Sequence, residues 1–412
     1  MKYFLEFSFF FILVFCLSSS QAQNTHVNDV IPFNRNNHTH WVDSIMKTLS
    51  VDQKIAQLFM IAANSRESNE LYYQKIDSLI MHYDLGGVIF FQSGPNELKN
   101  LLDRYNRVSN LPLLTSIDAE WGLGMRLDSV ELFPWMMTLG AIQDDNAIYD
   151  FGFEVASQLK ALGVHINFAP VLDVNNNPNN PIINRRSFSS DVDIVSNKAL
   201  AYMKGMQDNG VLACGKHFPG HGDTDVDSHK GLPVLNHDME RLDSLELKPF
   251  QYLIQRGLGG VMIAHMNLPL IDTLQIPSSF SSQIIKGLLK EKMAFKGLII
   301  SDALNMGALS EYTNPGTIEL NAFLAGNDIL LCPNQNNIMQ SIELIKSVVS
   351  TQPMLMSQLN SSCKKILMTK KWAGAFNSRP VQHHKISLMT EESNYINHKL
   401  SKNAITVLKN KN

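Results

Sequence analysis

The chain has 412 residues, of which 44% are hydrophobic and 18% are charged, and its formal net charge at pH 7 is -3. This composition is typical of a globular protein with one large domain or two ordinary ones. The near-neutral balance, without a basic stripe, argues against a nucleic acid as a partner.

The first 22 residues have the pattern of an export signal. Lys2 precedes an apolar run over residues 7–17, and Ser20-Gln21-Ala22 suits cleavage between small residues. The run is too short for a comfortable membrane span. We therefore expect a signal peptide over 1–22, an exported protein in the periplasm or outside the cell, and no stable membrane anchor after cleavage. The polar residues 23–40 predict a flexible lead-in.

Hydrophobic residues recur at helical spacing from Trp41 to Leu49, and Ser50 then has the pattern of a helix N-cap. Beyond it, short apolar runs alternate with amphipathic stretches. The predicted strands are Gln57–Ala62, Gly87–Phe91, Leu113–Ile117, His165–Ala169, Val211–Lys216, Gly260–Ala264, Gly297–Ser301 and Asp328–Cys332. The predicted helices between them are Leu71–Met81, Asn96–Ser109, Asn146–Leu162, Asp193–Asp208, Met239–Gln255, Ser281–Lys290 and Glu319–Ala325.

Strands that alternate with helices favour parallel pairing through helical crossovers. Eight such units predict an α/β fold, a closed (β/α)8 barrel of the TIM type. An open doubly wound sheet is the alternative. Because no glycine-rich dinucleotide or phosphate-binding motif is present in the chain, we favour the barrel.

Ionisable residues fall at the ends of successive predicted strands. Asp118 ends the third strand, Asp173 follows the fourth, and Lys216-His217 end the fifth. His265 ends the sixth strand and Asp302 the seventh. Since the carboxyl ends of barrel strands meet at one face, these groups predict an active site there.

The densest group of ionisable residues is the stretch from Lys216 to His229, which holds three histidines, one lysine and three aspartates. His217, His221 and His229 could bind zinc together with Asp302, as in a metal-dependent hydrolase. Lys216 would oppose a cation there, so we expect no metal.

Five segments carry a resemblance to glycoside hydrolase family 3, in particular to its β-N-acetylhexosaminidase branch. These are Ser116–Gly122 with Arg126, Asn167–Val174, Asn184–Phe188, Gly215–Gly222 with Asp227-Ser228-His229, and Ile300–Met306. The resemblance runs from about Trp41 to about Trp372 and implies a catalytic barrel over residues 41–376.

The resemblance implies a catalytic role for three residues. Asp302 would be the nucleophile that forms a covalent glycosyl-enzyme, although an aspartate there also suits the N-cap of a following helix. His229 would be the general acid and base, because the ordinary pKa of an imidazole, about 6.5, suits both tasks. Asp227 would orient the imidazole.

The resemblance also implies a sugar-binding set. It consists of Asp118, Arg126, Arg186, Lys216 and His217. Arg185 is adjacent to Arg186, and the alignment with Ser187-Phe188 favours Arg186 as the inward residue. We expect His221 and Asp223 to shape the loop, and Asp173 and His265 to line or brace the pocket floor.

Residues 377–412 are a C-terminal extension. Within it, Lys402–Asn410 resembles the first strand of the family's second domain, which indicates a shortened member or a fragment whose C-terminal domain is missing. Because His229 and Asp227 lie within the barrel, that domain is not needed to supply the acid/base residue.

The expected function is that of an exported, retaining exo-β-N-acetylhexosaminidase. It would remove terminal N-acetylglucosamine from peptidoglycan fragments or chitooligosaccharides without a cofactor. Three alternatives stay open besides the metal-dependent hydrolase: a β-glucosidase-like enzyme of the same family, a phosphorolytic enzyme, and an inactive sugar-binding protein of the cell wall.

Overall fold

The computed structural model describes residues 31–34, 39–64, 66, 69–312, 314–377 and 388–407. The expected signal peptide therefore lies outside the described residues, as does most of the expected lead-in. Within that lead-in, Pro32–Asn34 forms a 3-10 helix in which Phe33 is buried, so this short part packs against the domain. In the described part of the chain, no helix is long and apolar enough to cross a membrane.

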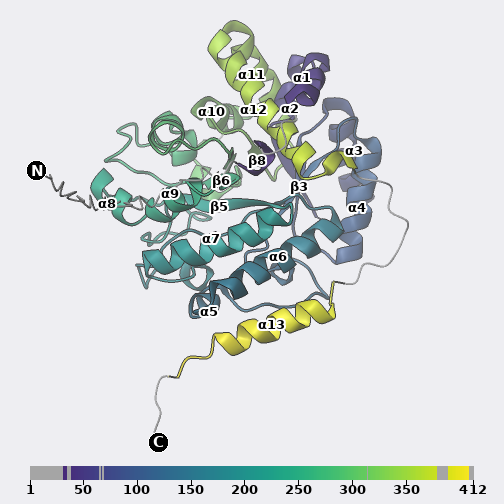
Figure 1. Cartoon of the computed structure of the whole chain (residues 1–412). Helices are drawn as coiled ribbons and strands as arrows, with labels where there is room; N and C mark the ends of the chain where they lie inside the picture. The colour runs from purple at the N-terminus through teal and green to yellow at the C-terminus, as the bar shows by residue number, and fades with distance from the viewer. Residues whose placement is uncertain are drawn as a thin grey trace, which may run out of the picture.

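Eight parallel strands form the centre of the molecule (Figure 1). They are β1 Phe59–Ala63, β2 Gly87–Phe90, β3 Leu114–Ile117, β4 Ile166–Asn167, β5 Leu212–Phe218, β6 Gly260–Ile263, β7 Leu298–Ser301 and β8 Leu330–Cys332. Each predicted strand is thus present, within a few residues at its ends. Every residue of these strands is buried, because helices cover the outside of the sheet and side chains fill its inside.

The strand order β7-β6-β5-β4-β3-β2-β1-β8 places β7 and β8 at the two ends of the sheet. A parallel bridge between Ile300 and Ile329 joins these ends. The Ile329 N–H donates to the Ile299 carbonyl at 3.0 Å, and the Ser301 N–H donates to the Ile329 carbonyl at 3.0 Å. The sheet therefore closes on itself as the predicted (β/α)8 barrel.

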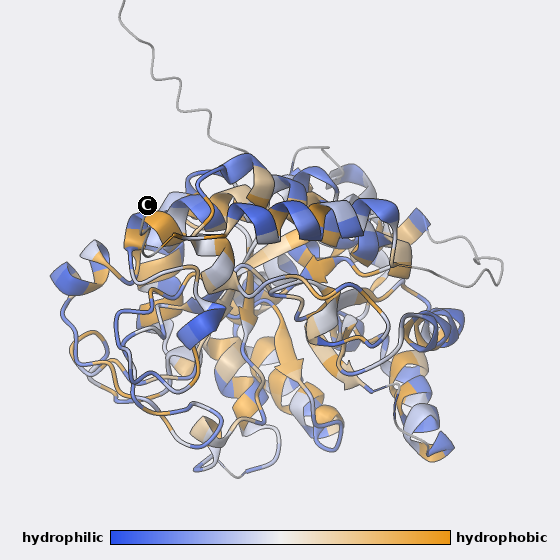
Figure 2. Ribbon diagram, turned by 90° about the horizontal axis from the view of Figure 1, so that it is seen from below, coloured by the Kyte–Doolittle hydropathy of each residue, from blue (hydrophilic) through white to orange (hydrophobic). Residues whose placement is uncertain are grey.

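Helices surround the barrel, with hydrophilic residues on their outer faces and hydrophobic strands at the centre (Figure 2). The α-helices are α1 Thr39–Thr48, α2 Val51–Ala56, α3 Glu70–Tyr83, α4 Pro95–Val108, α5 Met136–Gly140, α6 Asp145–Leu162, α7 Val192–Asp208, α8 Met239–Ser244, α9 Lys248–Ile254, α10 Thr317–Ala325, α11 Ile338–Thr351, α12 Pro353–Trp372 and α13 Glu391–Asn403. Ser50 caps α2 as predicted, in a capping box with Gln53.

Two of the predicted helices differ in the structure. The stretch Met239–Gln255 breaks into α8 and α9, because Pro249 lies in the first turn of α9, where proline favours a helix start. The stretch Ser281–Lys290 becomes a π-helix, η5, over Gln283–Lys292.

The C-terminal segment also differs from the expected strand. Residues 402–403 end α13, residues 404–407 form no strand, and residues 408–410 lie outside the described residues. Helix α13 lies along α6 (Figure 1), where Lys399 pairs with Asp150 at 2.8 Å. The described part of Lys402–Asn410 is therefore helix and exposed chain.

Candidate active site

A cavity of about 560 Å³ opens at the carboxyl ends of the barrel strands. Seven of the eight predicted site residues line it: Asp118, Arg126, Arg186, Lys216, His217, His229 and Asp302. The eighth, Asp227, lies directly behind His229. The strand ends thus bring together side chains from four loops, as the barrel geometry predicts.

Carboxylates and cations alternate at the base of the cavity. Lys216 Nζ lies 2.7 Å from Asp118 Oδ1 and 2.8 Å from Glu120 Oε1. Arg126 Nη2 donates to Asp118 Oδ2 at 2.7 Å. Arg186 binds Glu120 through two parallel hydrogen bonds, of 2.9 Å from Nε and 2.7 Å from Nη2. Each buried charge is thus compensated, which fixes the side chains in place.

These contacts keep the base of the cavity charged. Burial works to raise the pKa of Asp118, but Lys216 and Arg126 outweigh it and hold that pKa below its ordinary value. Burial opposes ionisation of Glu120 in the same way, and Arg186 and Lys216 again lower the pKa. Burial works to lower the pKa of Lys216, which its two carboxylate partners raise above the ordinary value. The cavity therefore offers charged donors and acceptors to the vicinal hydroxyls of a sugar.

Glu120 is a site residue that the sequence analysis did not single out. It lies two positions after Asp118, in a segment that carries the family resemblance, and its side chain is fully buried. Its place within that segment was the one signal in the sequence, because the pairing with Arg186 and Lys216 is visible only in the structure. The structure also separates the tandem arginines: Arg186 lines the cavity, whereas Arg185 is exposed and lies over the ring of Trp135 at 3.7 Å.

Asp173 braces the cavity from behind and does not line it. Its Oδ2 accepts from His217 Nδ1 at 2.7 Å, and its Oδ1 accepts from the His221 N–H at 2.6 Å. Asp173 is 1% exposed, so both bonds are shielded from water. The peptide bond between Lys216 and His217 is cis. Asp173 therefore fixes both ends of the turn that follows β5.

Asp302 follows β7 directly, and its Oδ1 accepts from the Ala303 N–H at 2.7 Å. No α-helix starts there, so the alternative role of helix N-cap is not realised. Burial works to raise the pKa of Asp302, but His217, His265 and the Ala303 N–H together hold it below its ordinary value. The carboxylate is therefore ionised near neutral pH and can act as a nucleophile.

His265 braces the segment that follows Asp302. Its Nδ1 lies 2.7 Å from Ser279 Oγ, and its Nε2 lies 3.1 Å from the Ala303 carbonyl oxygen. His265 is fully buried and is a bracing residue, one of the two roles that its position predicted.

Asp227 and His229 form a dyad on the loop of residues 219–232, here called the catalytic loop. His229 Nδ1 lies 2.8 Å from Asp227 Oδ1, which also accepts from the His229 N–H at 2.9 Å. Because an ionised carboxylate only accepts, Nδ1 carries a proton and Nε2 is left for another partner. The His229 side chain is 60% exposed, so Nε2 can reach a group that enters the cavity.

The catalytic loop is attached on its inner side. His221 Nδ1 lies 2.6 Å from Thr224 Oγ1, and its Nε2 lies 3.1 Å from Ser228 Oγ. Burial and the neighbouring His217 lower the pKa of His221 to about 4, so this ring is neutral near pH 7. The Ala308 N–H donates to the Ser228 carbonyl at 3.1 Å. His221 therefore shapes the loop, as predicted.

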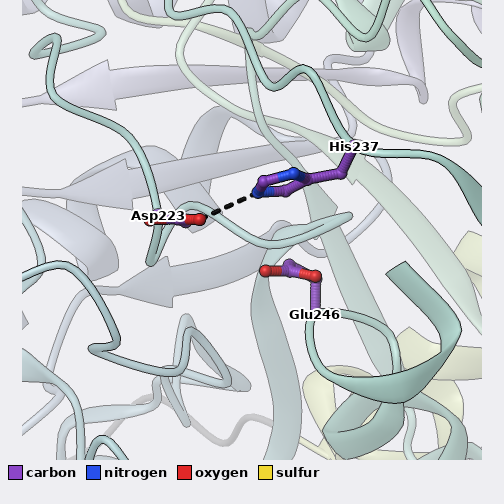
Figure 3. A group of neighbouring side chains, drawn as sticks. All are labelled: Asp223, His237 and Glu246. Carbon is purple, nitrogen blue, oxygen red and sulfur yellow. Dashed lines mark hydrogen bonds and ion pairs between the residues drawn. The ribbon is translucent and has the colours of Figure 1, made fainter. Parts of the chain in front are cut away.

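In the described part of the chain, His217, His221 and His229 do not gather into a metal site. Both ring nitrogens of His221 already have partners, as does His217 Nδ1. Among the described residues, the single group with a suitable set of ligand atoms is Asp223, His237 and Glu246 (Figure 3), none of which lines the cavity.

An ionised carboxylate and an oriented histidine in one cavity are groups that a glycosidase can use. The barrel and its cavity therefore indicate that the chain is a glycoside hydrolase. Residues 50–369 match the glycosyl hydrolase family 3 N terminal domain, and the chain belongs to glycoside hydrolase family 3.

Relatives and solved structures of this family are similar to the chain over most of its length. Beta-hexosaminidase A of Pseudoalteromonas piscicida is 34% identical over 327 residues, which are 72% of this chain and 55% of that protein. A beta-hexosaminidase of Nitrosomonas eutropha is 34% identical over 66% of this chain and 81% of its own length. The chain thus spans about half of the first relative and most of the second.

A solved structure has the same fold. The glycoside hydrolase family 3 β-N-acetylglucosaminidase from Paenibacillus sp. str. FPU-7 superposes with a TM-score of 0.81 at 33% identity, over 89% of this chain and 70% of that one.

Proposed function

We propose that this chain is a retaining exo-β-N-acetylhexosaminidase that removes terminal N-acetylglucosamine from peptidoglycan fragments or chitooligosaccharides. The observation that carries the proposal is the presence of Asp302 and His229 in one cavity, with His229 held by Asp227 on the barrel itself. The names of the similar proteins, which are hexosaminidases and an N-acetylglucosaminidase, support the choice of sugar.

In the first step, an Asp302 oxygen attacks the anomeric carbon while the bond from that carbon to the leaving oxygen breaks. The protonated His229 gives its Nε2 proton to the leaving oxygen, so the aglycone departs as an alcohol. Asp227 stabilises the imidazolium before transfer and holds the ring in place. Burial works to raise the pKa of Asp227, but the backbone and ring N–H groups of His229 outweigh it and lower that pKa.

In the second step, His229 Nε2 takes a proton from a water molecule. The water oxygen attacks the anomeric carbon, and the bond to Asp302 breaks to regenerate the carboxylate. Two inversions at one carbon retain the configuration. The imidazolium that results is the acid required for the next cycle.

The charged base of the cavity favours binding of a chain end. Glu120 and Lys216 have side-chain exposures of 0% and 3%, so the floor beneath them is closed. A terminal sugar can enter and bond to Asp118, Arg126 and Arg186, whereas an internal sugar would need an exit for the chain beyond it. This closed floor supports an exo-acting enzyme.

The test is release of nitrophenol from 4-nitrophenyl N-acetyl-β-glucosaminide, with the glucoside as the competing substrate. The proposal expects preference for the N-acetyl sugar, no effect of EDTA, and loss of turnover in Asp302→Ala. His229→Ala should lose about 10²–10⁴-fold with a poor leaving group. A preference for the glucoside would favour the β-glucosidase alternative, and a sugar phosphate formed in phosphate buffer would favour phosphorolysis. Binding of the sugar without turnover would indicate an inactive binding protein.

We also infer that the chain is exported, from the pattern of residues 1–22. N-terminal sequencing of the protein recovered from its native host should begin at Gln23. A mature protein that begins at Met1 would contradict the inference.

A further inference from the structure

A second group of ionisable residues, Asp223, His237 and Glu246, brings the catalytic loop together with the segments on either side of α8 (Figure 3). Asp223 belongs to the loop, His237 precedes α8, and Glu246 follows α8. His237 Nε2 donates to Asp223 Oδ2 at 2.8 Å, and the ligand atoms of all three residues lie within 4.8 Å of one another. The residue types would suit a divalent cation.

Arg241 on α8, and not a metal ion, supplies the positive charge of this group. Its Nη2 lies 3.3 Å from Asp223 Oδ2 and 3.0 Å from Glu246 Oε1. A guanidinium between two carboxylates neutralises them and would repel a metal ion placed beside it. The group is therefore an ion-pair network centred on Arg241.

Glu246 also packs against the start of the catalytic loop. Gly220 has a φ of 138°, and a Cβ built on it would lie 2.8 Å from the Glu246 Cβ. The Glu246 side chain is 3% exposed, so its charge depends on Arg241 for compensation. Arg241 thereby connects α8 to the loop at Asp223 and, through Glu246, at Gly220.

The tip of the loop lies between Thr224 and Ser228, two buried residues that bond to His221. Asp225 is exposed, Val226 is 39% exposed, and the His229 side chain projects into the cavity mouth. Asp227 follows Asp223 by four residues, so the ion-pair network and the dyad lie on the same short loop. Arg241 itself does not line the cavity.

We propose that Arg241 is a positioning residue, whose ion pairs with Asp223 and Glu246 hold the catalytic loop so that the Asp227–His229 dyad reaches the leaving group. The proposal rests on the proposed function, in which His229 protonates the leaving oxygen. Replacing Arg241 should therefore lower activity most on substrates whose leaving group must be protonated.

The kinetic test compares two substrates in Arg241→Met. The parameter kcat/KM reports the steps up to the glycosyl-enzyme, where His229 acts as an acid. Chitobiose has a poor leaving group that needs the proton, whereas a 2,4-dinitrophenolate leaves without it. We expect kcat/KM to fall about tenfold or more with chitobiose and less than about twofold with the dinitrophenyl glycoside. Arg241→Lys, which keeps the charge, should recover part of the loss.

A matched control removes another ion pair of the same helix. Asp243 on α8 pairs with Lys292 at 2.6 Å, and both side chains are 49% exposed. Asp243→Asn should leave both kcat/KM values unchanged. An equal loss on both substrates in Arg241→Met would show that Arg241 only supports the fold and would overturn the proposal.

Amide hydrogen exchange tests the same claim without turnover. Peptides that cover residues 222–230 should exchange faster in Arg241→Met and in Asp223→Asn than in the unchanged protein or in Asp243→Asn. Unchanged exchange in both variants would overturn the positioning role. If the unchanged protein hydrolyses neither substrate, the proposed function fails, and the exchange rates still decide whether Arg241 holds the loop.

Discussion

Gly307 lies against the backbone of His229, and a Cβ built on Gly307 would come within 2.4 Å of the His229 carbonyl oxygen. The two residues belong to the loops that follow β7 and β5, which carry the proposed nucleophile and the proposed acid. The close approach holds the two loops together, and the bond from the Ala308 N–H to the Ser228 carbonyl supports it.

Gly307→Ala should displace His229 and lower kcat/KM for chitobiose about tenfold, because general acid catalysis depends on hydrogen-bond reach. Gly287→Ala is the control, since a Cβ there meets only the Gln283 side chain, at 3.6 Å. The melting temperature of Gly287→Ala should stay close to that of the parent, whereas that of Gly307→Ala should fall, because the added Cβ displaces the His229 backbone. Unchanged activity in Gly307→Ala would show that the loops need not touch.

Lys216→Met should destabilise the fold as well as abolish sugar binding. The lysine side chain is 3% exposed and lies between the Asp118 and Glu120 carboxylates. Removing one partner of a buried ion pair costs about 3–5 kcal/mol, because the remaining charges lose their compensation. Urea denaturation of Lys346→Met is the comparison. That lysine pairs with Asp52 at the surface, where a pair contributes about 0–1 kcal/mol. Equal stability of the two variants would contradict this view of the cavity floor.

Lys370 should make stability depend on pH above neutrality. Burial lowers its pKa from 10.5 to about 7, and its Nζ donates to Gln57 Oε1 at 2.7 Å. Between these two values the unfolded chain holds a proton that the folded chain lacks, so the free energy of unfolding rises with pH, by at most about 1.4 kcal/mol per unit. Below about pH 7 the folded chain bears the full cost of burying the charged lysine. Above the ordinary pKa of 10.5 it bears none of that cost.

Lys370→Met removes this titration and should flatten the dependence between pH 7 and 9, measured by urea denaturation. Methionine also leaves the Gln57 carbonyl oxygen without its donor, which lowers the stability at every pH. The change of stability with pH is therefore compared, and not the stability at one pH. Lys346→Met should keep the slope of the parent. The same slope in the parent and in Lys370→Met would refute the assignment.

The sequence predicted the barrel because its strands are buried on both faces, which produces eight separate apolar runs such as Gly87–Phe90 and Leu298–Ser301. Helix ends and helix type were less predictable. The hydrophobic pattern of Met239–Gln255 continues across the break at residues 245–247. Likewise, the spacing of apolar residues in Gln283–Lys292 does not distinguish a π-helix from an α-helix.

The residues of the candidate site also fall into those that the sequence predicted and those that only the structure revealed. Asp118, Lys216 and Asp302 follow from their positions at strand ends, and the resemblance to the family adds Arg186 and His229. Glu120 and Arg241 depend instead on contacts between residues that are distant in sequence, such as the pairing of Glu120 with Arg186. The positions of single residues along the chain do not reveal such pairs.

Mass spectrometry of a trapped intermediate can show whether Asp302 forms a covalent bond to the sugar. A 5-fluoro analogue of N-acetylglucosaminyl fluoride slows both steps, so the glycosyl-enzyme should accumulate. We expect a peptide that contains Asp302 with the mass of one sugar added, and no such peptide from Asp302→Asn. A label on another residue, or turnover that inverts the anomeric configuration without any covalent adduct, would contradict it.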